Sequence, residues 1–355
     1  MIMETLTNYD SVQQVASGFG LQEARVEPLG RGLIHHTYLA EQNGRSMVLQ
    51  QINTKVFADP QALIANYLAI YEHLQQQGSV KIPAPVPTSN GGWLLYGNDN
   101  NTWRATEYIE NSYTPGSTEN VKAAYTTAAC FGRFTKSLAG MDIRQLQVLL
   151  ADFHDLAYRY QQFEDAVTNT QGMRLMRSTH VIAELRQRRH LVDFYNAIKN
   201  NPDFPLRLMH HDCKIDNILF DAHTKEVICP IDLDTIMPGK YFSDLGDMIR
   251  TMACTVDENS REWEHIDTKP EFYDAIVDGY LDGIGNELSS EEKAHIHKSG
   301  LIMTYMQTLR FVTDFLQGDA YYKTTYPEQN LNRALNQLIL LEKMEDFLAA
   351  KKVGS

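Results

Sequence analysis

Residues 210–217 read HHDCKIDN, and residues 231–239 read IDLDTIMPG. Each of these polar stretches follows a short apolar segment, 206–209 before the first and 227–231 before the second. Apolar runs of this length, bounded by polar residues, are consistent with buried strands. The sequence therefore predicts two polar loops, each at the end of a strand, and these two loops decide the fold class.

The two loops contain the residue types that phosphoryl transfer to a hydroxyl group requires. Such a reaction needs a carboxylate that orients the nucleophile and accepts its proton, oxygen ligands for Mg²⁺, and a cation that meets the charge of the γ-phosphoryl group. We expect Asp212 to be the base and Lys214 to be the cation. Asn217 and Asp232 are the expected magnesium ligands. Either loop alone is more simply a solvated acidic loop, but both together, with Asp232 twenty residues after Asp212, favour a kinase.

Other polar residues near the loops are expected to have structural roles. Asp244 should brace the first loop by accepting backbone hydrogen bonds, and His210 should fix it through a side-chain hydrogen bond. Cys213 lies beside Asp212 without a histidine or cysteine to act with, so we interpret it as a space-filling residue. The pair His35-His36 lacks a matching set of ligands and is not interpreted as a metal site.

The first third of the chain is predicted to be rich in β-strands. Strand-like runs occur at 25–29, 34–40 and 46–52, after a short helix near 11–19. Asn43-Gly44 lies between the second and third runs, and both residues tolerate the positive φ of a tight hairpin turn. A second hairpin is expected from the segments 93–96 and 102–109.

One helix in this part of the chain has signals at both ends. Asp59 is a favourable N-cap residue, and Pro60 suits the first helical position. Gly78 can end the helix because glycine readily adopts a left-handed conformation. The sequence therefore predicts a helix between these residues.

From residue 118 onward the pattern is mostly helical, with heptad-like apolar spacing at 123–138 and 301–316. The predicted fold class is therefore α+β, with the two lobes of a protein-kinase-like (aminoglycoside phosphotransferase) fold. We expect a small β-rich lobe over residues 1–109, a hinge near 108–110, and a larger, mainly helical lobe over 110–355 that carries the catalytic and acceptor residues.

Residues of the small lobe are expected to bind the nucleotide. Gly30-Arg31-Gly32 falls between two strands, where a phosphate-covering hairpin belongs, because glycine lets backbone N–H groups approach phosphates. Tyr108 and Ile109 are the expected hinge contacts. Protein kinases carry a lysine on the third strand, but this chain has Gln50 at that place. Gln50 either donates a neutral hydrogen bond to the nucleotide or indicates an impaired site.

Composition excludes several classes of partner. The formal net charge is −13, and no long block of Lys and Arg is present, so a nucleic acid or an anionic membrane surface would be repelled. The four cysteines form no CxxC pair, and the first residues resemble no signal peptide. We expect a cytoplasmic protein that uses ATP and Mg²⁺ and binds a small-molecule acceptor; the sequence does not indicate an oligomeric state.

The two loops resemble those of protein kinases, and more closely those of aminoglycoside and choline kinases. The run LQQIN at 49–53 and the string at 231–239 make the resemblance more specific. Together they resemble the bacterial N-acetylhexosamine 1-kinases, anomeric sugar kinases of the aminoglycoside phosphotransferase and choline kinase superfamily. Further matching stretches extend the resemblance over nearly the whole chain: Trp103-Arg104, 244–250, Arg310-Phe311, Gly318-Asp319 and 326–328.

This resemblance implies roles for individual residues. It implies that Asp212 is the catalytic base and that Asp212 and Asp232 also face the sugar, in a pocket that includes Arg310 and Tyr321. Because the family itself has glutamine on the third strand, it implies an active enzyme despite the absent lysine. The implied reaction is phosphorylation by ATP of the C1 hydroxyl of a free hexose or N-acetylhexosamine.

Two candidate sugar-binding positions depart from the family pattern. Leu33 stands where the family has a histidine that contacts the sugar, and Thr251 stands where the family has an aromatic residue. Both lie where the sugar and its 2-substituent are expected. The sequence therefore leaves the preference for an N-acetyl group open.

The sequence also leaves two other functions open. A kinase of another small alcohol would need an acidic acceptor cleft for aminoglycosides or an aromatic cage for choline. A catalytically inactive scaffold that binds a nucleotide would not require Asp212, Lys214, Asn217 and Asp232 together, and all four are present.

Overall fold

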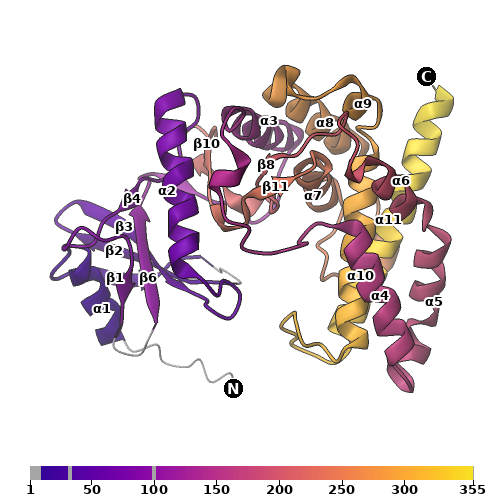
Figure 1. Cartoon of the computed structure of the whole chain (residues 1–355), viewed down its shortest axis with the longest axis horizontal. Helices are drawn as coiled ribbons and strands as arrows, with labels where there is room; N and C mark the ends of the chain where they lie inside the picture. Colours follow the sequence, from indigo (N-terminus) through magenta and orange to yellow (C-terminus); the bar gives the residue numbers. More distant parts are fainter. Residues whose placement is uncertain (1–8, 31–33, 98–100, 355) are drawn as a thin grey trace.

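The first lobe, on the left of Figure 1, is built on an antiparallel sheet covered by helices. The computed structural model describes residues 9–30, 34–97 and 101–354. The strands of this lobe are β1 (Arg25–Pro28), β2 (His36–Gln42), β3 (Arg45–Ile52), β4 (Pro85–Val86), β5 (Leu95–Tyr96) and β6 (Thr102–Glu107). They follow the order β1-β2-β3-β6-β4, and β5 also pairs with β6.

Both predicted hairpins are confirmed. Strands β2 and β3 pair in antiparallel fashion from His36 opposite Gln51 to Gln42 opposite Arg45. The turn between them has φ of 51° at Asn43 and 74° at Gly44, which is the left-handed conformation that this dipeptide favours. Strands β5 and β6 form the second pair.

The two faces of this sheet have different surroundings. Helix α1 (Tyr9–Gly18) packs against one face, where Leu49, Trp103 and Ala105 are buried. Because side chains alternate along a strand, Gln50 and Arg104 lie on the opposite face. These two residues are register partners in β3 and β6.

Helix α2 (Pro60–Gln77) has the predicted ends and stands between the sheet and the second lobe (Figure 1). The Ala62 N–H donates to Asp59 Oδ1 at 3.0 Å, and the Gly78 N–H donates to Leu74 O at 2.9 Å. Gly78 has φ 64°, as expected for the residue that ends a helix. Local capping rules were therefore sufficient to locate this helix.

The apolar face of α2 packs on residues of the second lobe. Ile64, Tyr67, Ile70 and Leu74 of α2 share one buried cluster with residues from the second lobe, namely Phe134, Leu138, Met141, Leu146, Leu208, Leu233 and Ile236. Burying one such side chain contributes about 1.5–3 kcal/mol. The two lobes are therefore joined by a common apolar core as well as by the chain.

The second lobe is mainly helical. Its helices are α3 (Val121–Ser137), α4 (Leu156–Asn169), α5 (Met173–Gln187), α6 (His190–Lys199), α7 (Phe242–Met252), α8 (Pro270–Ile284), α9 (Ser290–Ala294), α10 (Lys298–Leu316) and α11 (Gln329–Gly354). Its short strands are β7 (Ser112–Tyr113), β8 (Arg207–Met209), β9 (Ile218–Asp221), β10 (Val227–Pro230) and β11 (Met237–Gly239). They form one sheet in the order β10-β9-β7 and a separate pair, β11-β8.

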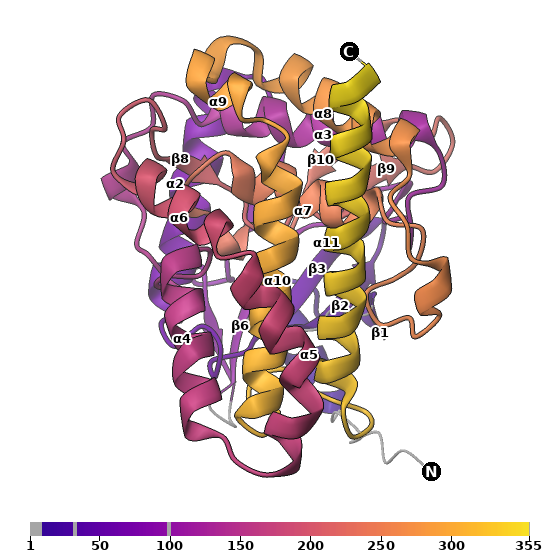
Figure 2. The same cartoon turned by 90° about the vertical axis from the view of Figure 1, so that its right-hand side faces the viewer.

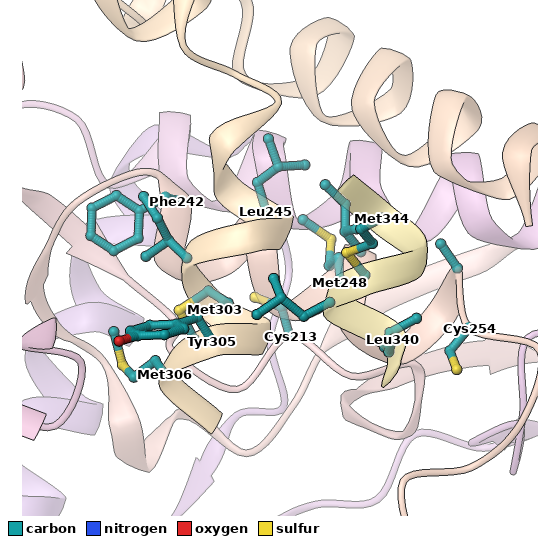
Figure 3. Close-up of a cluster of buried hydrophobic side chains, with 14 of the residues drawn as sticks. Cys213, Phe242, Leu245, Met248, Cys254, Met303, Tyr305, Met306, Leu340 and Met344 are labelled. Atoms are coloured by element: carbon teal, nitrogen blue, oxygen red, sulfur yellow. The ribbon is translucent and has the colours of Figure 1, made fainter. Parts of the chain in front are cut away.

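The largest apolar core lies between the helices of this lobe. Helices α10 and α11 lie side by side over α7, with α4 and α5 on the outer surface (Figure 2). Figure 3 shows the part of this core that contains Cys213, with Leu245, Met248, Met303 and Met344 around it. Cys213 is fully buried, and burial raises the pKa of its thiol well above the usual value. Its predicted space-filling role is confirmed.

The α+β, two-lobed fold predicted from the sequence is confirmed. Strand β6 ends at Glu107, and β7, which begins at Ser112, pairs with β9 in the second lobe. The predicted boundary between residues 109 and 110 falls between these strands and stays a prediction. Across the part of the chain that the structure describes, no helix is both long and apolar enough to cross a bilayer.

Candidate active site

The first polar loop follows β8 and is held by two aspartates of α7. Asp244 accepts hydrogen bonds from the backbone N–H groups of His210 at 3.0 Å and of His211 at 2.8 Å. Asp247 accepts a third from the Cys213 N–H at 3.0 Å. The expected bracing role of Asp244 is confirmed, and Asp247 adds a second support. The backbone on both sides of Asp212 is therefore fixed.

Asp212 is held by both expected neighbours. Lys214 Nζ lies 2.9 Å from Asp212 Oδ1, and Asn217 Nδ2 donates to Asp212 Oδ2 at 2.9 Å and to its carbonyl oxygen at 2.8 Å. Burial alone would raise the pKa of Asp212, but the charge of Lys214 and these hydrogen bonds outweigh it, so its pKa is lowered. The attraction of Asp212 raises the pKa of Lys214. The pair is ionised at neutral pH.

The second polar loop lies directly beside the first. The Ile231 N–H donates to the carbonyl oxygen of Asn217 at 2.9 Å, and His210 Nε2 lies 3.0 Å from the carbonyl oxygen of Ile231. The next residue, Asp232, has φ 59° and ψ 58°, a left-handed conformation that is uncommon for residues other than glycine. These bonds bring Asn217 and Asp232 together and confirm the loop-fixing role of His210.

The oxygen atoms of these two residues suit a hard cation. Asn217 uses its amide nitrogen on Asp212, and within the described ranges its Oδ1 and the Asp232 carboxylate accept no hydrogen bond. Burial by the surrounding protein and the charges of Asp234 and Asp212 raise the pKa of Asp232. A cation bound to Asp232 would relieve the repulsion from these neighbouring carboxylates.

The protein side chains alone do not complete a metal cage. No group of three or more His, Cys, Asp and Glu side chains is arranged around a common centre in the residues that the structure describes. Magnesium is commonly held by one or two protein oxygens together with water and phosphate oxygens. Two protein oxygen ligands, from Asn217 and Asp232, therefore suit a Mg²⁺ ion that is also bound by phosphate oxygens better than a metal held by the protein alone.

The candidate nucleotide residues of the first lobe are described only in part. Gly30 has φ 72° and is exposed near the start of the β1–β2 connection, where the Leu29 N–H donates to Thr37 O at 2.9 Å. Arg31 and Gly32 lie outside the described residues, as does Leu33. Tyr108 and Ile109 are half-buried in the segment that joins the lobes. Their nucleotide contacts remain predictions.

Gln50 has a cation beside it that the sequence did not indicate. Its Oε1 accepts a hydrogen bond from Arg104 Nε at 3.0 Å, while its Nε2 makes only a long bond of 3.4 Å to Thr37 Oγ1. The guanidinium group of Arg104 in turn binds Asp234 of the second polar loop at 2.6 and 2.7 Å. The place of the third-strand lysine is therefore taken by a glutamine that is bonded to a buried arginine.

Two predicted acceptor residues, Arg310 and Tyr321, meet in one pocket. The guanidinium carbon of Arg310 lies 5.9 Å from the ring centre of Tyr321, 5.6 Å from that of Tyr322 and 4.9 Å from that of Phe153. Asp314 accepts the backbone N–H groups of Tyr321 and Tyr322 at 2.7 and 3.0 Å, which fixes the loop that carries them.

Among the residues that the structure describes, this pocket carries a second arginine and only one acidic side chain. It is lined by Arg159, Gln162, Arg310, Thr313, Asp314, Gln317, Tyr321 and Tyr322. Both oxygens of Asp314 accept hydrogen bonds from its own surroundings. Arg159 donates to the carbonyl oxygen of Phe153 at 3.1 and 3.2 Å, and burial together with the charge of Arg310 lowers its pKa. In the described part of the chain neither arginine has a carboxylate partner.

Phe153 and His154 connect this pocket to the first polar loop. The Phe153 ring is 6.3 Å from the ring of His211, the residue before Asp212, and His154 stacks on Phe153 at 4.4 Å. Ser243 Oγ lies 2.5 Å from His154 Nδ1 and 2.6 Å from His211 Nδ1. Burial lowers the pKa of both histidines, so both are neutral at neutral pH. The pocket around Arg310 therefore lies one aromatic side chain away from the first polar loop.

The sequence did not predict Phe153, His154 or Arg159 as site residues. They belong to an irregular segment and the start of α4, and no motif marks them. Thr251 lies on α7, half-buried, and its hydroxyl donates to the carbonyl oxygen of Asp247 at 2.7 Å. This bond within the helix ties up the hydroxyl, and no contact in the described residues joins Thr251 to Arg310 or Tyr321.

The fold and the paired polar loops define a phosphotransferase of the two-lobed, kinase-like class. A model of the APH family, described as a phosphotransferase enzyme family, matches residues 25–289, which is more than half of the chain. The chain belongs to the APH phosphotransferase family. The superfamily expected from the sequence is thereby confirmed.

Solved structures of low sequence identity share the whole fold. A microcompartment-associated aminopropanol kinase is 18% identical, with a TM-score of 0.62, and the match covers 97% of this chain and 98% of that one. An aminoglycoside phosphotransferase from Alicyclobacillus acidocaldarius subsp. acidocaldarius DSM 446 is 15% identical, with a TM-score of 0.66 and coverages of 96% and 95%. Choline kinase LicA from Streptococcus pneumoniae is 14% identical, with a TM-score of 0.57 and coverages of 95% and 99%.

Proposed function

We propose that this protein is a kinase that transfers the γ-phosphoryl group of ATP to the C1 hydroxyl of a free hexose or N-acetylhexosamine, in the presence of Mg²⁺. The family supplies the class of reaction, and the acceptor pocket supports the choice of acceptor. The resemblance of the sequence to anomeric sugar kinases supports the choice of hydroxyl group. The roles of individual residues below belong to this proposal.

The observation that carries the choice of acceptor is the charge of the pocket around Arg310. An aromatic cage would bind a quaternary ammonium group, but here the rings of Phe153, Tyr321 and Tyr322 already surround the guanidinium of Arg310. Arg159 adds a second positive charge. A cationic acceptor such as choline or an aminoglycoside would be repelled. A neutral acceptor rich in hydroxyl groups suits planar guanidinium donors and an exposed tyrosine ring.

Asp212 is proposed to orient the acceptor hydroxyl and to take its proton. Its lowered pKa makes it ionised but weakly basic, so it accepts a hydrogen bond from the hydroxyl before transfer and the proton only as the new O–P bond forms. The anomeric hydroxyl is the most acidic in a free sugar, which suits such a base. The bond between the γ-phosphorus and the bridging oxygen of ATP breaks in the same step, and Lys214 lies close enough to meet the charge of the group in transit.

The remaining proposed roles concern the nucleotide and its metal. Asn217 and Asp232 would hold Mg²⁺, which would offset phosphate charge when bound. Gly30, with Arg31 and Gly32, would cover the phosphates, while Gln50 and the segment Tyr108-Ile109 would contact the rest of the nucleotide. The roles of Arg31 and Gly32 rest on the sequence alone, because both residues lie outside the described ranges.

The identity of the product tests the proposed reaction directly. We expect a purified preparation with ATP, Mg²⁺ and GlcNAc, GalNAc, glucose or galactose to give a sugar 1-phosphate in phosphorus NMR. The corresponding 1-O-methyl glycosides should be inert because the accepting hydroxyl is blocked. A 6-phosphate signal, or rapid turnover of a methyl glycoside, would overturn the anomeric assignment and leave the family assignment intact. Choline and kanamycin in the same assay test the alternative acceptors.

Arg310 should matter for the acceptor and much less for the nucleotide. We expect Arg310→Ala to raise the KM for the sugar by about 10-fold to 10²-fold, the value of a lost charged hydrogen bond, with little change in the KM for ATP. Arg310→Lys keeps the charge but not the planar fork and should recover only part of the loss. Steady-state kinetics with each substrate varied in turn measure both constants. Equal increases in the KM for the sugar and the KM for ATP would contradict a role of Arg310 in binding the acceptor.

A further inference from the structure

A buried polar cluster joins the sheet of the first lobe to the second polar loop. Arg104 of β6 grips Asp234 with both terminal nitrogens, Nη1 at 2.6 Å from Oδ1 and Nη2 at 2.7 Å from Oδ2. His35 Nε2 lies 2.7 Å from Asp234 Oδ2. The exposed fraction is 2% for Arg104, 4% for Asp234 and 6% for His35. The cluster is therefore closed to solvent.

The hydrogen bonds of this cluster fix the state of each member. His35 Nδ1 accepts the backbone N–H of Asn53 at 3.1 Å, so the proton of the neutral ring is on Nε2, which donates to Asp234. Arg104 Nε donates to Gln50 Oε1 at 3.0 Å. Two residues of the first lobe, His35 and Arg104, thus bind one carboxylate of the second, and Asn53 and Gln50 hold them in place.

Asp234 is two residues beyond Asp232, which has a left-handed backbone. Such a conformation costs about 1–3 kcal/mol and persists only where the surroundings impose it. The residues after Asp232 are held firmly: Leu233 and Ile236 are buried, and Thr235 Oγ1 donates to His210 O at 2.6 Å. The bonds to Asp234 supply the polar tie to the opposite lobe, beside the apolar contacts that Leu233 and Ile236 share with α2.

A buried ion pair is a poor means of stabilising a protein, because desolvation offsets most of the attraction between the charges. An ion pair that joins the two lobes next to a metal-binding loop can instead fix the position of that loop relative to the first lobe. Partners that orient a metal ligand commonly change metal affinity by about 10–100-fold when they are removed.

We propose that Arg104, Asp234 and His35 form an interlobe clasp, in which Asp234 is a positioning residue for Asp232 and is not itself a metal ligand. The clasp holds the metal-binding loop at a fixed place under the sheet of the first lobe. This inference rests on the proposed role of Asp232 in binding Mg²⁺, and it does not depend on which acceptor the enzyme uses.

The test compares single and double variants by metal binding rather than by turnover. The variants are Asp234→Asn, Arg104→Met and the two combined, and the measurement is the affinity for Mn²⁺ in the presence of ADP by titration calorimetry. We expect each single variant to weaken Mn²⁺ binding by about 10-fold or more, and the double variant to be no weaker than either single one.

Unfolding temperature separates positioning from stability. Arg104→Met leaves the buried carboxylate with His35 as its remaining partner and without a compensating charge on Arg104, so it should lower the unfolding temperature strongly, whereas the double variant removes both charges and should regain much of it. The clasp predicts that Mn²⁺ affinity stays low in the double variant even as stability returns. If Mn²⁺ affinity and unfolding temperature both recovered in the double variant, the Arg104–Asp234 pair would be only a stabilising contact.

Two further variants keep the test decisive. Glu292→Gln is the matched control, because Glu292 is fully buried and gripped by Arg207 at 2.7 and 2.8 Å within the second lobe. It should lower the unfolding temperature without changing Mn²⁺ affinity. If Arg104→Met does not fold, His35→Gln removes the smaller part of the clasp and should weaken Mn²⁺ binding several-fold.

The outcomes distinguish this inference from the proposed function. Weaker binding in Asp234→Asn with normal binding in Arg104→Met and His35→Gln would make Asp234 a metal ligand and overturn the clasp. Normal binding in all clasp variants would also overturn it. Normal Mn²⁺ binding in Asp232→Ala would instead contradict the proposed role of Asp232 as a metal ligand, which belongs to the proposed function.

Discussion

Asp212→Asn should lower kcat by about 10²–10⁴-fold, the usual contribution of a general base. The substitution removes the negative charge that orients the acceptor hydroxyl and takes its proton, and it keeps the shape of the side chain. The loop should stay in place, because Asp244 and Asp247 hold its backbone through bonds that the change does not touch. Single-turnover kinetics with saturating substrates measure the effect on the chemical step.

The control for this variant is Asp216→Asn in the same loop. Asp216 is exposed, and its carboxylate makes no hydrogen bond within the described residues. We expect the Asp216 variant to keep nearly full activity and both variants to keep the unfolding temperature and nucleotide affinity. If the Asp212 variant retained more than about a tenth of the wild-type kcat, a general-base role would be wrong.

Removal of the metal, or of its proposed ligand, should have an effect of similar size. We expect EDTA to abolish turnover, and Mg²⁺ or Mn²⁺ to restore it. Asp232→Ala should lower kcat/KM by roughly 10²-fold or more even at saturating Mg²⁺, because a metal can supply several kcal/mol of charge stabilisation in the transition state. Asp216→Ala, a nearby exposed acid, serves as the control.

The pH dependence of metal binding follows from the surroundings of Asp232. Burial and the neighbouring carboxylates raise its pKa, so protons compete with the metal for this carboxylate more than they would for an isolated one. The affinity for Mn²⁺ should therefore fall as the pH is lowered, and the fall should be smaller in Asp232→Ala. Turnover that does not need a divalent metal would exclude the proposed mechanism.

The parts of the fold that follow local rules were predictable. The turn at Asn43-Gly44 and the helix between Asp59 and Gly78 depend on the conformational preferences of residues next to each other in the chain. The two polar loops were recognised by residue type and spacing. Resemblance to a family, not periodicity, indicated Arg310 and Tyr321, which the structure brings into one pocket.

Contacts between distant parts of the chain were not predictable from one sequence. Arg104 and Asp234 are 130 residues apart, and nothing in either local sequence marks them as partners. Phe153 reaches Arg310 from an irregular segment that carries no motif. His35 was not interpreted as part of a metal site, and its bond to Asp234, which the sequence did not indicate, depends on how the lobes meet.

The apolar cluster under α2 also bears on how the chain can be divided. Ile64, Tyr67 and Ile70 belong to the first lobe by sequence, but their burial depends on residues of the second, such as Phe134 and Leu138. A polypeptide cut near residue 109 would leave this helix face exposed to water, at a cost of about 1.5–3 kcal/mol for each large side chain. The lobes are thus separate in architecture but are not autonomous folding units. A chimera that exchanges the first lobe between relatives would also have to exchange the residues of the second lobe that bury α2.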